Sequence, residues 1–340
     1  MAGADYVFTA RRVRDGRFQA EPGPVRYLKV PADAPVPTPA HQMGGPGGIK
    51  AWVAEVRALA DANPNPHAIS PAGDVLVFVH GYNNDLPIIM QRQRRLAADL
   101  RAEGWRGVVV SFDWPSDDST LNYLEDRWDA AEVALSLVTK GIKVLARGQE
   151  NGCETNVHLL GHSTGAYVIL EAFTQAEKDG NLFKSDWRMG QVAFIGGDVS
   201  RDCLSTDDDW SAPLFKRIMR LTNYANPFDG VLAVSNAKRL GVSPRVGRVG
   251  LPANARPKAV NVDCGEHFQT LDPNQATYFG TFNHSWHIGD RVFARDLAMS
   301  LEGGIDRQAI PTRRREGGRL VLQDAPRPAH MGGWWQDGQG

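Results

Sequence analysis

The central part of the chain alternates between short, continuously hydrophobic runs and longer segments with apolar residues at helical spacing. The runs are rich in β-branched residues and lack polar alternation, which is typical of strands buried on both faces. The predicted strands are 75–81, 107–114, 156–162, 191–197, 217–223 and 258–264. The predicted helices are 88–104, 126–148, 165–180, 211–218 and 291–301. This alternation predicts a parallel sheet covered by helices, with the strand carboxyl ends along one edge, where we expect a site.

Residues 1–73 follow a different pattern and are expected to form a lead-in that packs on the core. Asp15-Gly16 is a turn signal between short alternating segments, which predicts a β-hairpin. A loop rich in proline and glycine follows, and then an amphipathic helix over 49–63. After this lead-in we place a central α/β domain at residues 74–301.

Residues 302–340 are rich in glycine and proline and are expected to form a C-terminal extension. Residues 319–323 have a strand-like pattern, and Trp334 and Trp335 stand near the end of the chain. We expect the two tryptophans to fill a groove on the body of the protein. The alternative is that the extension exchanges between copies of the chain and makes a homo-oligomer.

The composition limits the kinds of partner. The 340 residues are 42% hydrophobic and carry a formal net charge of -1, as expected for a soluble protein with a sizeable core. A charge so close to zero argues against nucleic acid or an anionic membrane as a partner. The N-terminus is not signal-like and no apolar stretch reaches about 18 residues, so we expect a cytoplasmic protein without a membrane span. Cys153, Cys203 and Cys264 have no metal-like spacing and fit unpaired thiols, although a single disulfide among them stays open.

The segment GHSTG, residues 161–165, matches the G-x-S-x-G pattern. The pattern alone is weak, because glycine and serine are common. Here a predicted strand precedes it and a predicted helix follows, which is the setting that projects the serine hydroxyl from a sharp turn. The helix N-terminus also provides N–H groups for an oxyanion. We therefore interpret Ser163 as a nucleophile, and the alternative is a small residue in a structural turn.

A serine hydroxyl becomes nucleophilic only when a base removes its proton, and an acid must orient that base. His284 and His287 lie in the segment FNHSWHIGD, between the last strand and the last helix, from which a base can reach the site. We favour His284 as the base, with His287 as a pocket wall or supporting group. For the acid we favour Asp229, which follows the strand at 217–223, and Asp198 is the alternative. No metal is expected, because the two histidines lack further ligands.

An oxyanion needs two hydrogen-bond donors. The backbone N–H of Thr164, directly after the serine, is one candidate. The other is the N–H of Tyr82 in the loop after the strand at 75–81, where Gly81 lets the backbone approach the reacting atom. The sequence thus predicts an oxyanion hole made by Tyr82 and Thr164.

Four motifs in this order resemble those of the α/β-hydrolase superfamily: the His80-Gly81 loop, the GHSTG turn, the NPFD loop and the late histidine. The stretches SFDWPSDD and HSW are similar to a bacterial branch of it that consists mostly of hydrolases of unknown function. The resemblance covers about residues 74–301. It implies a mostly parallel sheet of eight strands, little or no lid, and acyl transfer to water through an acyl-enzyme with Ser163, Asp229 and His284 as the triad. The sequence departs from the pattern at His287, where a second aromatic residue is expected.

Six residues near these motifs are the candidate substrate-binding residues. Most of them are aromatic, and this favours a substrate with an apolar part. They are Asn83, Trp114, Tyr123, Phe228, Trp286 and His287. The expected function is hydrolysis of carboxylic esters, in small molecules or polymers, without a cofactor. An amidase, a peptidase or an acyltransferase with the same triad stays open, because loops and not the fold set the substrate. A non-catalytic binding protein on the same fold is the third hypothesis.

Overall fold

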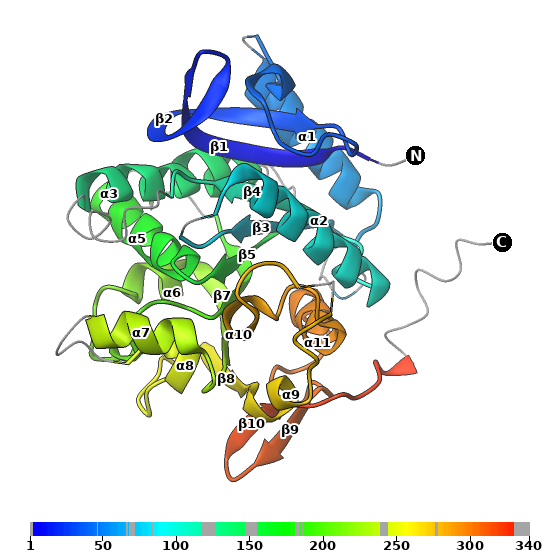
Figure 1. The fold of residues 1–340 in the computed structure, drawn as a ribbon, viewed down its shortest axis with the longest axis vertical. Helices are drawn as coiled ribbons and strands as arrows, with labels where there is room; N and C mark the ends of the chain where they lie inside the picture. Colours follow the sequence, from blue (N-terminus) through cyan, green and yellow to red (C-terminus); the bar gives the residue numbers. More distant parts are fainter. Residues whose placement is uncertain are drawn as a thin grey trace.

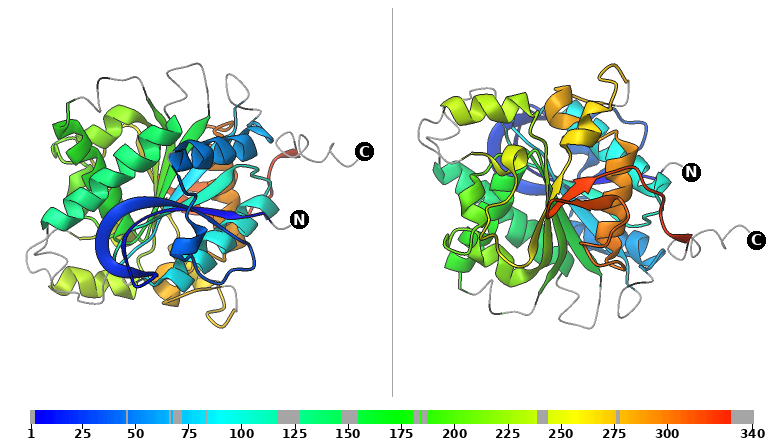
Figure 2. Two further views of the ribbon diagram at one scale, coloured as in Figure 1. Left: turned by 90° about the horizontal axis from the view of Figure 1, so that it is seen from above. Right: turned by 90° about the horizontal axis from the view of Figure 1, so that it is seen from below.

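The computed structural model describes residues 3–45, 47–65, 67, 72–82, 84–116, 127–146, 155–180, 184, 187–238, 244–275 and 278–329. A sheet of ten strands passes through the molecule, with helices on both of its faces (Figure 1, Figure 2). Across the sheet the strands lie in the order β2-β1-β4-β3-β5-β6-β7-β8-β10-β9. The predicted α/β fold class is confirmed, and the sheet has ten strands rather than the expected eight.

The six strands predicted in the central region are all present, each displaced by no more than a few residues. The strands are β1 (Asp5–Arg14), β2 (Arg17–Val30), β3 (Asp74–Val79), β4 (Val108–Asp113), β5 (Asn156–His162), β6 (Met189–Ile195), β7 (Ile218–Ala225), β8 (Ala259–Asp263), β9 (Arg313–Glu316) and β10 (Arg319–Leu322).

The predicted helices are present too, although the one expected at 126–148 is built from three consecutive pieces, the middle one a π-helix. The helices are α1 (Gly48–Asp61), α2 (Leu86–Ala102), α3 (Arg127–Ser136), η3 (Leu137–Ile142), α4 (Lys143–Ala146), α5 (Gly165–Lys178), α6 (Ala212–Arg217), α7 (Gly230–Lys238), α8 (Val246–Val249), α9 (Gly265–Gln269), α10 (Phe282–Ser285) and α11 (Arg291–Glu302), with short 3-10 turns η1 (Pro39–His41) and η5 (Arg201–Leu204).

Two hairpins add four strands to the six central strands and bring the sheet to ten. The strands from β1 to β10 across the sheet pair in parallel, whereas β2 and β9 pair antiparallel at its two edges. The hairpin of β1 and β2 adds to β4, and the hairpin of β9 and β10 adds to β8. Both satisfy backbone groups that the free edges of β4 and β8 would leave unpaired. The predicted turn at Asp15-Gly16 is confirmed, with positive φ angles of 50° and 71° as this hairpin turn requires.

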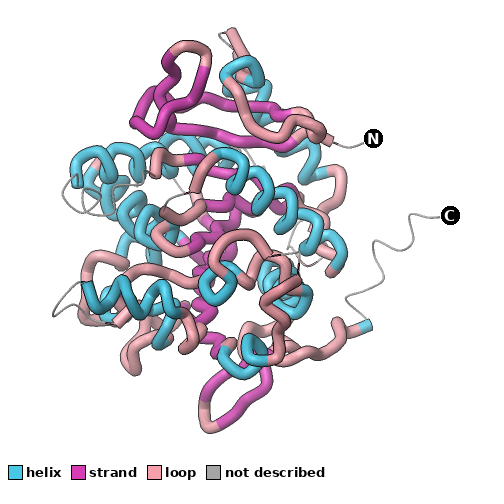
Figure 3. Tube along the Cα trace, in the orientation of Figure 1, coloured by secondary structure: helices cyan, strands magenta, loops and turns pink. Residues whose placement is uncertain are grey.

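The core consists of two layers, one on each face of the sheet. Successive residues of β3 alternate between them: Val75, Val77 and Val79 join the layer covered by α1, α3 and α5, and Leu76 and Phe78 join the layer covered by α2 and α11. Figure 3 shows the strands running between the helices. Because both faces are covered, the strand needs no polar alternation, which explains its continuous apolar run.

A buried ion pair attaches the C-terminal hairpin to the body. The guanidinium of Arg313, at the start of β9, lies 2.5 Å from the carboxylate of Asp296 in α11, and neither side chain is exposed to solvent. Tyr224 of β7 donates a hydrogen bond to the same carboxylate at 2.6 Å. In the described part of the chain, no helix is long and apolar enough to cross a membrane.

Candidate active site

Ser163 stands at the sharp turn between β5 and α5. Its φ is +55°, and the only other non-glycine residue with a positive φ among the described residues is Asp15 in the hairpin turn. A serine is strained in this conformation, and such strain is concentrated at functional sites. The turn is held by its backbone: Ser163 N–H donates to Ile195 O at 3.0 Å, and Ser163 O accepts from Asp198 N–H at 3.0 Å.

Two glycines leave room for this turn. A Cβ on Gly165 would lie 2.2 Å from the carbonyl oxygen of Val79, so the start of α5 can pack directly on the end of β3 only without a side chain there. A Cβ on Gly81 would lie 2.7 Å from the Cβ of Ser163. The loop after β3 therefore passes directly against the serine, where the sequence predicted one side of an oxyanion hole.

His284 and Asp229 form a buried pair near the serine turn. Nδ1 of His284 donates to Oδ2 of Asp229 at 2.7 Å, and Oδ1 of the same carboxylate accepts from Leu232 N–H at 2.9 Å. The pairing fixes the proton on Nδ1 and leaves Nε2 as the basic atom. This Nε2 is buried and has no hydrogen-bond partner among the described residues, so the structure records no hydrogen bond from Ser163 Oγ to it.

Gly196 connects the histidine to the serine turn. A Cβ at this position would lie 3.0 Å from Cε1 of His284, and its φ of +53° suits glycine. Its neighbour Ile195 accepts the hydrogen bond from the backbone N–H of Ser163. The end of β6 therefore touches both His284 and the serine turn.

Asp198, the alternative acid, has different partners. Its carboxylate lies 3.1 Å from the guanidinium of Arg245 and accepts a hydrogen bond from Ser235 Oγ at 3.1 Å. The structure thus joins Asp229 to the histidine and Asp198 to an arginine.

Three of the predicted substrate-binding residues, Trp114, Trp286 and His287, are buried in this structure. Trp114 is stacked on His80 with ring centroids 5.4 Å apart, and its Nε1 donates to the His80 carbonyl at 2.8 Å. Trp286 is 0% exposed, and His287 stacks on it at 4.1 Å. Neighbouring groups cover all three side chains, and their contact with a substrate stays a prediction.

Phe228 is the predicted substrate-binding residue that stays accessible. Its side chain is 46% exposed, directly before Asp229. It stacks on Phe268 with centroids 6.1 Å apart, and Phe268 stacks in turn on Phe282 at 5.2 Å. An aromatic surface therefore borders the histidine pair. Asn83, Tyr123, Trp334 and Trp335 lie outside the described residues.

The N-terminal strand β1, which lies between β2 and β4 in the sheet, contacts the loops near the site. Arg11 of β1 pairs with Asp113 at the end of β4, with Nε 2.8 Å from Oδ1. Its Nη2 donates to the carbonyl oxygens of Asn84 at 3.3 Å and Trp114 at 3.2 Å. A buried ion pair thus ties β1 to the loops after β3 and β4.

Sequence reasoning missed Arg92, a buried residue of α2 that contacts three parts of the site. Its guanidinium donates to Asn84 Oδ1 at 2.8 Å and Ser285 Oγ at 3.0 Å, and lies 3.5 Å from Nδ1 of His162. Burial, then the nearby Arg92 cation, hold the pKa of His162 well below its usual range, so its ring is neutral. The available signal was a charged residue at helical spacing among the apolar residues Ile89, Leu96 and Leu100.

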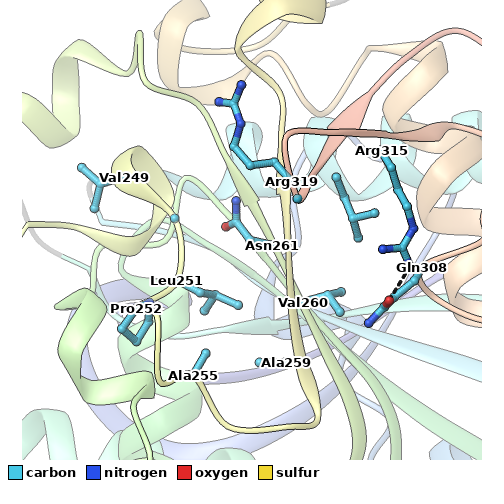
Figure 4. A pocket seen from close by; sticks show the side chains of 13 residues that line it. Val249, Leu251, Pro252, Ala255, Ala259, Val260, Asn261, Gln308, Arg315 and Arg319 are labelled. Carbon is cyan, nitrogen blue, oxygen red and sulfur yellow. Dashed lines mark hydrogen bonds between the residues drawn. The ribbon is translucent and has the colours of Figure 1, made fainter.

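Within the described ranges, no group of three or more His, Cys, Asp or Glu side chains is placed to hold a metal ion. A cavity of about 400 Å³ lies elsewhere, at the start of β8, where Arg315 and Arg319 stand over apolar residues such as Leu251 and Val260 (Figure 4). None of its lining residues belongs to the serine turn or to the histidine pair.

Comparison with known protein families gives one match. The model of the family described as "Alpha/beta hydrolase of unknown function (DUF900)" matches residues 61–285, which is 225 of the 340 residues. The matched range contains Ser163, Asp229 and His284. No curated protein matches the chain.

Solved structures with some similarity include a dienelactone hydrolase from Anabaena variabilis ATCC 29413, at 15% identity over 58% of this chain and 78% of that chain, with a TM-score of 0.30. A metagenomic carboxyl esterase shares 15% identity over 57% of this chain and 64% of its own, with a TM-score of 0.26. An extracellular alpha/beta-hydrolase from a Paenibacillus species shares 14% identity over 56% of this chain and 77% of its own, with a TM-score of 0.23. Similarities at this level carry no argument about substrate.

Proposed function

Because the chain belongs to the α/β-hydrolase family whose model matches residues 61–285, we propose that this hydrolase is a serine enzyme that cleaves carboxylic esters. In this proposal Ser163 is the nucleophile, His284 the general base and Asp229 the acid that orients the base. The observation that carries the proposal is the buried pair of His284 Nδ1 and Asp229 Oδ2 at 2.7 Å, beside a serine held at positive φ. The proposed substrate is an ester with an apolar part, in a small molecule or a polymer.

The proposed reaction begins with proton transfer from Ser163 Oγ to Nε2 of His284 as the oxygen attacks the ester carbonyl carbon. The carbonyl oxygen becomes an oxyanion, which accepts hydrogen bonds from the backbone N–H groups of Tyr82 and Thr164. Collapse of this intermediate breaks the bond to the alcohol oxygen, which takes the proton from Nε2. A water molecule then repeats the sequence on the acyl-enzyme and releases the carboxylic acid.

The buried Asp229 carboxylate favours this chemistry in two ways. The Asp229 carboxylate stabilises the imidazolium that forms on His284 when it takes the proton, and this attraction is stronger away from bulk water. The hydrogen bond to Nδ1 also prevents the other tautomer, in which Nε2 would carry the proton and could not act as a base.

A fluorophosphonate probe and p-nitrophenyl esters test the proposal. We expect the probe to label Ser163, and Ser163→Ala to abolish both labelling and ester turnover. The matched control is Ser205→Ala, which changes a buried serine in the turn after η5 and should leave both unchanged. A folded wild-type protein that the probe does not label contradicts the proposal. Turnover of p-nitroanilides without turnover of esters would identify an amidase instead.

A further inference from the structure

The peptide between Gly81 and Tyr82 carries the proposed oxyanion donor on one side and a carbonyl on the other. Because a trans peptide points its N–H and C=O in opposite directions, the partners of Gly81 O set the direction of Tyr82 N–H. This oxygen accepts from Nδ1 of His80 at 2.8 Å and from Nδ2 of Asn84 at 2.7 Å. Nδ2 of Asn84 also donates to Tyr82 O at 3.2 Å. The Asn84 amide therefore holds the loop in place.

Arg92 determines which way that amide faces. An asparagine side chain can rotate by half a turn and exchange its oxygen with its nitrogen. In the rotated form, the NH₂ group of Asn84 would face the Arg92 cation, and its oxygen would face the carbonyl oxygens of Gly81 and Tyr82. Each of these contacts would be repulsive. Nη1 of Arg92 donates to Oδ1 of Asn84 at 2.8 Å, which selects the form that binds the Gly81 and Tyr82 carbonyls.

The other end of the same guanidinium binds the segment that carries His284. Nη2 donates to Phe279 O at 3.1 Å and to Oγ of Ser285, the neighbour of the histidine, at 3.0 Å. Gly280 permits this contact, since its φ is +90° and a Cβ there would lie 2.5 Å from Nη2. One side chain thus connects the loop after β3 with the segment around α10.

The surroundings of Arg92 are unusual for a buried arginine. Arg92 is only 4% exposed, and its hydrogen-bond partners among the described residues are all neutral groups. The buried Arg11 and Arg313, by contrast, pair with Asp113 and Asp296. Burial lowers the pKa of Arg92 to about 10, so it stays charged at neutral pH. A buried cation without a carboxylate partner is costly, and it favours negative charge nearby.

From these contacts we infer that Arg92 is a positioning residue: it orients the Tyr82 N–H toward the oxyanion through Asn84, and holds the His284 segment at the same site. The inference rests on the proposed function. Arg92 touches no reacting atom in this scheme, so its loss should slow the chemical step and leave ground-state binding of the ester almost unchanged.

Steady-state kinetics with a p-nitrophenyl ester test the inference. Arg92→Met keeps most of the length of the side chain but removes the guanidinium, with its N–H donors and its charge. It should lower kcat by about 100-fold and change KM by less than about threefold, as expected for loss of one oxyanion donor. Arg92→Lys keeps the charge and should recover part of that loss. The matched control is Arg95→Met on the same helix, whose guanidinium pairs with Asp99 at 2.9 Å, and its kcat should stay within about twofold of the wild-type value.

A double-mutant cycle separates positioning from a general loss of stability. Asn84→Ala should lower kcat by about as much as Arg92→Met, and the double variant should be no worse than either, because both act on one peptide. Affinity for a trifluoromethyl ketone, which forms an oxyanion adduct with the serine, should fall in parallel with kcat. If Arg92→Met does not fold, the same comparison is made with Arg92→Lys.

Two outcomes overturn the inference: wild-type kcat in folded Arg92 variants, or effects that multiply in the double variant. These results differ from failure of the proposed function, in which the wild-type protein itself is not labelled by the fluorophosphonate. Labelling of the wild-type protein and of every Arg92 variant at the same rate would keep the proposed function and reject the role of Arg92.

Discussion

Nδ1 of His284 lies 2.7 Å from Oδ2 of Asp229, although the two residues are 55 positions apart in the chain. The fold brings them together because Asp229 lies in the short loop between β7 and α7, directly before α7, and α10 packs against α7. Asn226 strengthens the same contact, since its side chain donates to the backbone oxygen of Asn283 at 3.3 Å. The loop that carries the proposed acid is thus fastened to the helix that carries the proposed base.

Asp229→Asn should lower kcat on an ester substrate by roughly 10³–10⁴-fold with little change in stability. The amide can still accept the hydrogen bond from Leu232 N–H, so the loop keeps its shape, but it no longer selects the Nδ1 tautomer of His284. Steady-state kinetics together with thermal unfolding measure both effects.

Asp198→Asn is the paired variant, because Asp198 was the alternative acid and is bound instead to Arg245 and Ser235. Its kcat should stay within about tenfold of the wild-type value, since no oxyanion donor or triad partner is lost. A loss in Asp198→Asn that equals or exceeds the loss in Asp229→Asn would assign the acid role to Asp198.

Gly81→Ala should reduce kcat by more than about 100-fold, because the added Cβ would lie 2.7 Å from the Cβ of Ser163 and displace the proposed oxyanion loop. Gly180→Ala, at a position where no atom of the described residues lies within 4 Å of the added Cβ, is the control and should retain wild-type activity. Equal activity of Gly81→Ala and the wild-type protein would argue against an oxyanion hole at this loop.

Phe228→Ala should change the preference for substrate length. The exposed ring borders the histidine pair, so its loss removes apolar contact area worth about 1–3 kcal/mol, or roughly 10–200-fold in kcat/KM, for long acyl or alkyl groups. Hydrolysis of p-nitrophenyl acetate should change little. The control is Met219→Ala, an apolar residue that is 55% exposed, near the start of β7 and far from its carboxyl end. A uniform loss over all chain lengths would exclude Phe228 from substrate selection.

Asp113→Asn should destabilise the protein by about 3 kcal/mol at neutral pH, because it leaves the buried Arg11 without its counter-charge. Burial alone would raise the pKa of the Asp113 carboxyl, but the Arg11 cation, together with the neighbouring His80 and a hydrogen bond from Thr9, outweighs it and lowers the pKa. A lowered carboxyl pKa stabilises the folded state fully above the unfolded pKa of about 3.9 and loses that effect as the pH falls below it.

Urea unfolding between about pH 3 and pH 8 checks this prediction, because it gives the free energy of unfolding of the wild-type protein and of Asp113→Asn at each pH. The difference between the two free energies of unfolding should be constant from about pH 8 to pH 5 and should narrow below about pH 4. A difference that widens as the pH falls would contradict the assigned direction of the pKa shift.

Much of the candidate site could be predicted from the sequence because its signals are local. The turn at Ser163 needs a strand, two glycines and a helix in close succession, and the sequence pattern predicts all three. The same holds for the strands, whose apolar runs reflect burial on both faces. The candidates Asp229 and His284 followed from the order of loops in a parallel sheet, which topology constrains strongly.

Contacts between distant segments could not be predicted. Trp114 and Trp286 look like pocket aromatics in the sequence, and only packing shows that both are buried. Sequence spacing places Arg92 on the buried face of a helix but does not identify Asn84, Phe279 and Ser285 as its partners.

The α/β class, the order of strands and helices and the serine turn could be predicted from the sequence, because they depend on periodicity and on residues that are near neighbours. Three features became visible only in the folded chain: the sheet has ten strands, His284 pairs with Asp229 and not Asp198, and Arg92 lies between the two loops. Each of these features depends on hydrogen bonds between segments far apart in the chain. The residue pattern of one segment does not predict which distant segment it will contact.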